Sequence, residues 1–151
     1  MTKDQKSRLK YYKTFSKEDQ AEWICNDCWK NCFLDENDYY MLHSPLFFRL
    51  NGSLKGMLCM DCVEKKLGRK LSADDIRICP LTIEPGRYTR NILLKYLSET
   101  FPTFTEEVIL DILYQACDMK IDYVESLIEI VKWKTEWTFL MILSTEHPKE
   151  N

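Results

Sequence analysis

Apolar residues recur at helical spacing through the second half of the chain. Beginning at Val108 they fall at positions i, i+1, i+4, i+5, i+8 and i+9, which predicts an amphipathic helix that starts at Thr105. A similar pattern after Thr89 predicts a helix before it, and a pattern opening at Asp122 predicts a third, longer helix. We therefore expect residues 87–151 to form a three-helix unit.

The third of these helices carries two apolar stripes. The first comprises Val124, Leu127, Ile128 and Val131, and the second comprises Ile130, Trp133, Trp137, Leu140 and Met141. One stripe is enough to pack a three-helix unit, so the second predicts either deep burial or a surface for a partner. Trp133 and Trp137 are the partner-binding candidates, because Trp is enriched at interface hot spots. The alternative is that both indoles fill an ordinary three-helix core.

The first half of the chain has shorter and less regular patterns. Residues 38–42 and 46–50 are rich in Tyr, Phe and Leu, which is typical of short strands, and turn-forming Asn, Gly and Ser follow at 51–53. Together they predict a β-hairpin. From residue 61 to residue 71 the apolar period becomes helical, with Gly68 weakening the middle of that helix.

Four of the seven cysteines form two C-x-x-C pairs, Cys25 with Cys28 and Cys59 with Cys62. A C-x-x-C turn lets two thiolates point at one ion, and two such turns complete the tetrahedral site that zinc prefers. The second pair lies at the start of the predicted helix, where the partial positive charge of the N-terminus stabilises thiolate. We therefore expect one structural Zn²⁺ ion bound by these four residues. Knuckle, hairpin and ligand-bearing helix together have the outline of a treble-clef zinc finger.

Other interpretations of the cysteines stay open at this point. Buried free thiols and redox pairs are the alternatives to metal binding. Cys32 extends the first pair to C-x-x-C-x-x-x-C and could replace one ligand, and His43 is a further possible ligand. Cys79 and Cys117 fit core positions.

These patterns predict an α+β fold that is mainly helical, with a small zinc-stabilised β-hairpin/helix module followed by the three-helix unit. Pro85 and Gly86 punctuate the chain between the two. The predicted domains are a basic N-terminal helical segment over 1–22, a four-cysteine zinc-binding module over 23–86 and an acidic helical unit over 87–151.

Enzyme chemistry is poorly represented in the sequence. A closed site of four thiolates leaves no open coordination position, which catalytic zinc requires. The chain has two histidines, so the usual general bases are scarce, and the Walker A, nucleophile-elbow and H-E-x-x-H patterns do not occur in it. Adjacent Asp74 and Asp75 follow a serine, which is typical of a helix start rather than of an acid–base pair. We expect a protein that is not an enzyme.

Three segments occur together in residues 23–78: Cys25-x-x-Cys28, D-Y-Y-M-L at 38–42 and L-C-M-D-C-V-E-K-K-L-G-R-K-L at 58–71. This combination resembles a group of small, largely uncharacterised zinc-finger proteins of bacteriophages and bacterial mobile elements. Trp29 departs from that group, in which glycine usually follows the first cysteine pair. The resemblance implies metal binding and a phage-like origin, and it implies no activity.

Charge is divided unevenly along the chain. Residues 1–95 hold 17 Lys/Arg and 13 Asp/Glu, a net of +4, whereas residues 96–151 hold 4 and 11, a net of −7. The cations that crowd the helix after the second cysteine pair are Lys65, Lys66, Arg69 and Lys70. A nucleic-acid-binding regulator that uses a basic helix at 63–71 is therefore the alternative function. Against it, the sequence pI of about 5.5 is low for a dedicated binder, and a solvated helix face explains the same charges.

The preferred hypothesis is a protein-binding adaptor or inhibitor. The zinc module would serve as a rigid support, and the helices would present Trp133 and Trp137 to a protein partner or to a second copy of the chain. A phage-like origin suggests a host protein as the target. Without a signal-peptide core or an apolar run of ~18 residues, we expect a cytoplasmic protein with no membrane contact, in the host cytoplasm for a phage-encoded chain.

Overall fold

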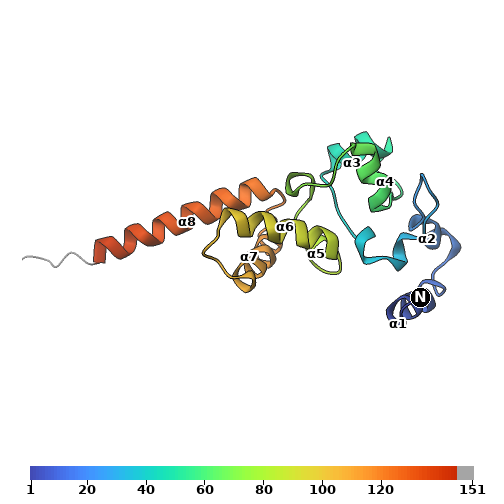
Figure 1. Ribbon diagram of the computed structural model, residues 1–151, viewed down its shortest axis with the longest axis horizontal. Coiled ribbons are helices and arrows are strands. Elements are labelled where there is room, and N and C mark those ends of the chain that lie inside the picture. The colour runs from blue at the N-terminus through green and yellow to red at the C-terminus, as the bar shows by residue number, and fades with distance from the viewer. Residues whose placement is uncertain (146–151) are drawn as a thin grey trace, which may run out of the picture.

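The computed structural model describes residues 1–145, which form a helical molecule. Its helices are α1 (Lys3–Tyr12), α2 (Lys17–Glu22), α3 (Ser44–Asn51), α4 (Met60–Leu67), α5 (Pro80–Ile83), α6 (Arg87–Thr100), α7 (Glu106–Asp118) and α8 (Val124–Thr145). The 3-10 turns between them are η1 (Cys32–Leu34), η2 (Glu36–Asp38) and η3 (Ala73–Asp75). The molecule is elongated, with α1 near one end and the long helix α8 projecting from the other (Figure 1).

The predicted β-hairpin is wrong. Residues 46–50 belong to α3, which has Pro45 in its first turn and Gly52 in the left-handed conformation at its C-cap. Proline is favoured at a helix start and glycine at a helix end, so these residues favour a helix where the aromatic content suggested a strand. Residues 38–42 are irregular, and extended segments in the described part of the chain make isolated bridges rather than a sheet. The chain is therefore mainly helical, as predicted, without the β part of the α+β class.

An aromatic cluster fixes the N-terminal helices to the cysteine region. The ring of Phe33 in η1 lies 5.5 Å from that of Tyr12 and 5.0 Å from that of Trp23, measured between centroids. Arg8 adds a hydrogen bond of 2.6 Å from its Nη2 atom to the Glu36 carboxylate. The basic segment at 1–22 is thus attached by aromatic packing and one ion pair.

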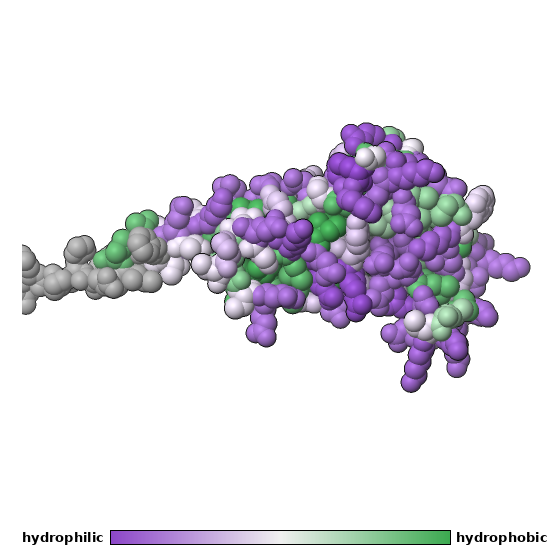
Figure 2. Space-filling model, in the orientation of Figure 1, coloured by the Kyte–Doolittle hydropathy of each residue, from purple (hydrophilic) through white to green (hydrophobic). Residues whose placement is uncertain are grey.

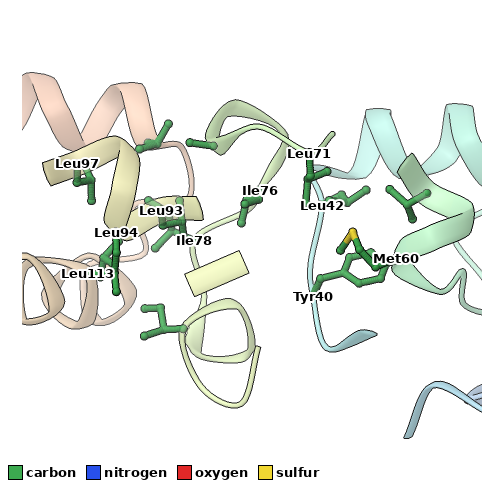
Figure 3. Packing of buried hydrophobic residues seen from close by; sticks show 14 of the residues in the cluster. Tyr40, Leu42, Met60, Leu71, Ile76, Ile78, Leu93, Leu94, Leu97 and Leu113 are labelled. Atoms are coloured by element: carbon green, nitrogen blue, oxygen red, sulfur yellow. The ribbon is translucent and has the colours of Figure 1, made fainter. Parts of the chain in front are cut away.

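One buried apolar cluster runs from the cysteine region into the later helices. Figure 3 shows Ile76 and Ile78, both buried, between a group that includes Met60 and Leu71 and a group that includes Leu93. Burial of such side chains stabilises a fold by about 1.5–3 kcal/mol each. The segment after η3 therefore links the packing of the two parts.

The predicted boundary at Gly86 lies in a close-packed region. A Cβ atom on Gly86 would lie 2.5 Å from the carbonyl oxygens of Leu81 and Tyr39. Only glycine allows this approach, which brings the start of α6 against the segment before α3. The division into 23–86 and 87–151 stays a prediction.

Threonine hydroxyls have different roles at the starts of α6 and α7. Thr105 caps α7 as predicted, because its Oγ1 accepts a hydrogen bond from the Val108 amide at 3.3 Å. The prediction that Thr89 begins a helix is wrong, since α6 begins at Arg87. Thr89 is buried in the first turn, where its hydroxyl donates to the Thr82 carbonyl at 2.8 Å.

Helix α8 has two unlike halves. Val124, Leu127 and Ile128 of its first stripe are buried, whereas every described side chain at 132–143 is exposed. We call residues 132–143 the arm, and Figure 1 shows it extending beyond the other helices. Neither α8 nor any other helix within the described residues is long and apolar enough to cross a bilayer.

Candidate metal centre

The first cysteine pair sits in a tight knuckle. An antiparallel bridge joins Ile24 to Asn31 across it, and the Cys25 amide donates to the Lys30 carbonyl at 2.8 Å. Trp29 closes the turn in the left-handed conformation with a φ of 65°, and its side chain is 79% exposed. The position at which the sequence departs from the phage group is therefore one that favours glycine.

The second pair is carried by the start of α4. Cys59 is the N-cap of this helix and Cys62 lies in its first turn, so both sulfurs lie near the positive end of the helix dipole. A parallel bridge between Cys25 and Met57, with the Asn26 amide donating to the Met57 carbonyl at 2.8 Å, brings the knuckle beside this helix.

The four sulfur atoms lie in an arrangement that can hold a metal ion. All four lie within 4.8 Å of one another, and the sulfurs of Cys28 and Cys59 are 3.5 Å apart. Tetrahedral coordination with metal–sulfur bonds of about 2.3 Å places sulfurs roughly 3.8 Å apart, so the spacing fits. Cys25 and Cys59 are buried, whereas Cys28 is exposed and Cys62 is half-buried. The predicted ligand set is thus brought together in space.

The ionisation of the thiols fits the same role. Burial opposes the ionisation of Cys25, but hydrogen bonds from the backbone of Cys59, Cys28 and Asp27 lower the pKa of this thiol to about 7. Burial raises the pKa of Cys59 to about 11, and burial together with the neighbouring sulfurs raises the pKa of Cys62. One thiolate therefore forms easily, and a bound cation would stabilise the others, with release of protons on binding.

Cys32 and His43 lie outside this group. Cys32 is fully buried, and its thiol donates to the Lys30 carbonyl at a sulfur–oxygen distance of 3.7 Å. Burial raises the pKa of Cys32, which keeps it protonated. The ring of His43 stacks on that of Tyr123 with centroids 3.8 Å apart. Within residues 1–145, the four paired cysteines are the group of possible ligands close enough to share one ion.

A buried carboxylate supports the cysteine cluster, and the sequence patterns did not indicate it. Asp38 is 1% exposed, accepts a hydrogen bond from the Met60 amide at 2.8 Å and pairs with the Lys30 ammonium at 2.8 Å. Lys30 lies in the knuckle and Met60 follows a ligand, so Asp38 connects the two halves of the site. The Tyr40 hydroxyl donates to the Leu58 carbonyl at 2.6 Å and fixes the same junction.

The four cations of the alternative hypothesis do not share one helix face. Helix α4 ends at Leu67, and Gly68 adopts the left-handed conformation after it, so the predicted helix over 63–71 is wrong in its last residues. Three of the cations are paired with carboxylates: Lys66 with Asp27 at 3.0 Å, Arg69 with Asp75 at 2.7 Å and Lys70 with Glu64 at 3.4 Å. Lys65 is exposed. Nearby carboxylates therefore offset much of the positive charge.

Trp133 and Trp137 lie on the arm and face solvent. Their side chains are 62% and 55% exposed, and their rings stack with centroids 6.0 Å apart. They do not fill the core of the helical unit, which excludes the alternative raised by their sequence pattern. Exposed indoles next to each other are characteristic of binding surfaces.

Comparison with protein-family models, with curated proteins and with solved structures finds no match to this chain. The class of protein is therefore inferred from the metal centre and the arm. The resemblance to phage zinc-finger proteins stays a prediction.

Proposed function

We propose that the four cysteines bind one zinc ion and that this ion is structural. Tetrahedral sets of four thiolates favour zinc or iron–sulfur centres, and two C-x-x-C pairs 30 residues apart are typical of zinc modules. The ion would join the knuckle to α4 and close the intervening loop. Small zinc modules draw much of their folding free energy from such an ion.

On this scaffold the protein acts as a non-enzymatic adaptor or inhibitor that binds another protein. The observation that carries the proposal is the exposed apolar half of α8. Figure 2 shows a hydrophobic patch on the part of this helix that projects from the molecule. Isolated helices of about 12 residues are marginal in water, so an apolar arm of this length is suited to binding a partner.

Two further observations support a role without catalysis. Four protein ligands would leave no coordination position for a substrate. The apolar groove between α7 and α8 has a volume of about 160 Å³, below the ~300 Å³ at which small-molecule sites begin, and the larger hollows beside α4, of about 390 and 530 Å³, are open and lined by few residues. The size of the groove suits side chains of a protein.

Nucleic-acid binding remains the alternative and is the weaker one. Lys66, Arg69 and Lys70 each form an ion pair with a carboxylate. These ion pairs would have to break, or their negative charges would lie next to the phosphates. Fluorescence anisotropy with random duplex DNA and single-stranded RNA across a salt series tests this directly. Binding that weakens steeply with salt would support the alternative.

The partner that fits a phage-like origin is a host protein. To test the adaptor role, the zinc-loaded protein is immobilised and exposed to a bacterial extract. Retained proteins are then identified, purified and titrated individually. We expect a purified partner to lose about 30-fold or more in affinity for the variant W133A/W137A, because even one interface tryptophan commonly contributes about 2 kcal/mol.

The matched control is W29A, which removes an exposed indole from the knuckle instead of the arm. It should leave the affinity unchanged. A purified partner that binds W133A/W137A as tightly as the wild type would contradict an adaptor role for the arm.

A further inference from the structure

We propose that the arm binds a second copy of this chain, with the arm of each copy lying in the α7–α8 groove of the other. The proposal rests on the proposed function, because it takes the arm as the binding surface. It goes further because it names the partner that the arm binds and the helix that fills the groove.

The groove is apolar and open. Its walls include Phe104, Val108, Ile112, Met119, Ile121 and Val131. Val108 and Met119 are 43% and 57% exposed, so apolar side chains of the wall face solvent. A groove of this kind between two helices suits an amphipathic helix laid along it.

The arm cannot occupy the groove of its own chain. Helix α8 forms one wall of the groove through Ile130, Val131, Lys134 and Thr135, so the first turn of the arm belongs to this wall and the rest of the arm continues the same helix. An uninterrupted helix does not fold back on itself, so the helix that fills the groove must come from another molecule. A second copy brings an arm of the right chemistry and offers a groove to the first arm in return. Such a reciprocal contact is the isologous interface of a twofold dimer.

The lengths of the two elements match. Helix α7 has 13 residues, and at about 1.5 Å per residue it offers a wall of roughly 20 Å. The arm at 132–143 extends over roughly 18 Å on the same measure. The arm can therefore lie along nearly the whole of α7 in the partner copy.

The charges of the two elements are complementary. Helix α7 contains four carboxylates and no Lys or Arg, a net of −4: Glu106, Glu107, Asp111 and Asp118. The arm contains Lys132, Lys134 and Glu136, a net of +1. The positive net charge of the arm is therefore complementary to the acidic α7 of a second copy.

The interface also offers enough surface. Each copy contributes both an arm and a groove, so every contact occurs twice. The exposed indoles number four in the dimer, and each buried Trp removes on the order of 150–250 Å² from water. With Leu140, Leu143 and the groove walls added, the total approaches the roughly 1,600 Å² of a typical stable interface.

The mass of the zinc-loaded full chain in solution tests the proposal. Light scattering coupled to size exclusion should give twice the 18.1 kDa of one chain for the wild type. W133A/W137A should raise the dimer dissociation constant by about 100-fold or more, since both copies lose two anchors. The control W29A should remain dimeric. Circular dichroism confirms that each variant is folded.

A charge-reversal pair tests the arrangement itself. K132E/K134E changes the net charge of the arm from +1 to −3, which should weaken self-association by about tenfold or more at low salt. E107K/D111K removes the net charge of α7, so mixing the two variants should restore dimers as a heterodimer. K95E, a single Lys→Glu reversal on the exposed side of α6, should have no effect.

The outcomes separate this inference from the proposed function. A wild-type monomer at about 100 µM, or a dimer that W133A/W137A leaves intact, overturns the second-copy proposal. In that case the adaptor role would still be supported if a purified partner bound the wild type but lost affinity for W133A/W137A. An arm-dependent dimer with no other partner supports the inference and overturns the host-protein part of the proposed function.

Discussion

Trp29 occupies a backbone conformation that its side chain disfavours. The left-handed region costs a residue with a Cβ atom about 1–2 kcal/mol, whereas glycine adopts it freely. Glycine also makes the unfolded chain more flexible, which offsets part of the gain. We therefore expect W29G to raise the free energy of unfolding of the zinc-loaded protein by about 0.5–1 kcal/mol in urea denaturation. W29A keeps the Cβ atom and should show no gain, so equal stabilisation by both variants would contradict the strain explanation.

Asp38 is a second residue whose effect can be measured separately. D38N removes the charge of a buried carboxylate, whereas Lys30 is 37% exposed and still pairs with Asp35, so we expect a loss of roughly 1–2 kcal/mol in the free energy of unfolding. Asp35 provides the matched control. It also pairs with Lys30 at 2.8 Å, but its side chain is 34% exposed, and D35N should cost less than about 1 kcal/mol. Similar losses in both variants would show that the buried carboxylate of Asp38 has no special role.

His43 makes stability depend on pH. Burial lowers the pKa of its imidazole, although the nearby Asp122 carboxylate acts in the opposite direction. A pKa that is lower in the folded state favours folding while the ring is neutral. The contribution is therefore complete above the unfolded pKa of about 6.5 and is lost as the pH falls.

We expect the wild type to lose more stability than H43F between about pH 7.5 and about pH 5, measured as urea midpoints at saturating zinc. The phenyl ring does not titrate and can keep the stacking on Tyr123. Because protonation of the cysteine ligands affects both proteins alike, the difference between them reports the imidazole. Parallel pH profiles would contradict the prediction.

At the scale of elements, a substitution at Gly68 tests whether the helix that carries Cys62 ends at Leu67 or continues to residue 71. In a helix that continued over 61–71, G68A would stabilise the protein by about 1 kcal/mol. The structure instead ends α4 with Gly68 at a φ of 72°, so the same substitution should destabilise it by about 1 kcal/mol. The sign of the change in the urea midpoint decides between a helix that continues through Gly68 and one that ends there. As a control, K65A at an exposed position within α4 should change the free energy of unfolding by less than about 0.5 kcal/mol.

The elements that the sequence predicted correctly are those whose signals are local. The cap at Thr105, the helical period of α7 and the two cysteine pairs depend on neighbouring residues. Residues 46–50 were misassigned because their aromatic side chains have high strand propensity, while Pro45 and Gly52 on either side favour a helix. The residues that flank this segment therefore override its strand propensity.

The metal centre was predictable in its ligands but not in its surroundings. The spacing of Cys25, Cys28, Cys59 and Cys62 predicted the group that the structure brings together. Nothing local to Asp38 indicates that its carboxylate holds the Met60 amide and the Lys30 ammonium, since both contacts depend on tertiary packing. The exclusion of Cys32 likewise follows from its burial and from its hydrogen bond, which no spacing rule shows.

At the scale of the whole molecule, the metal centre and the later helices differ in what stabilises them. The cysteine region has short helices and irregular segments, held by Asp38, by an aromatic cluster and, on the proposed function, by the metal ion. The helices α5, α6 and α7 pack on one another around residues such as Leu93 and Leu113. A ligand that binds the native state alone stabilises the region that forms its site, so metal removal should act unevenly along the chain.

We expect chelation of zinc to unfold residues 23–78 while α6 and α7 keep much of their helical signal. Hydrogen exchange would show loss of protection in the cysteine region, and circular dichroism would show partial loss of helix that zinc restores. C28S should reproduce the effect, because it removes a ligand, whereas C32S should keep one zinc per chain because its thiol lies outside the group. Unchanged thermal stability after metal removal would contradict a structural role for the ion. Uniform loss of protection along the chain would instead show that the apolar cluster through Ile76 and Ile78 makes the molecule unfold as one unit.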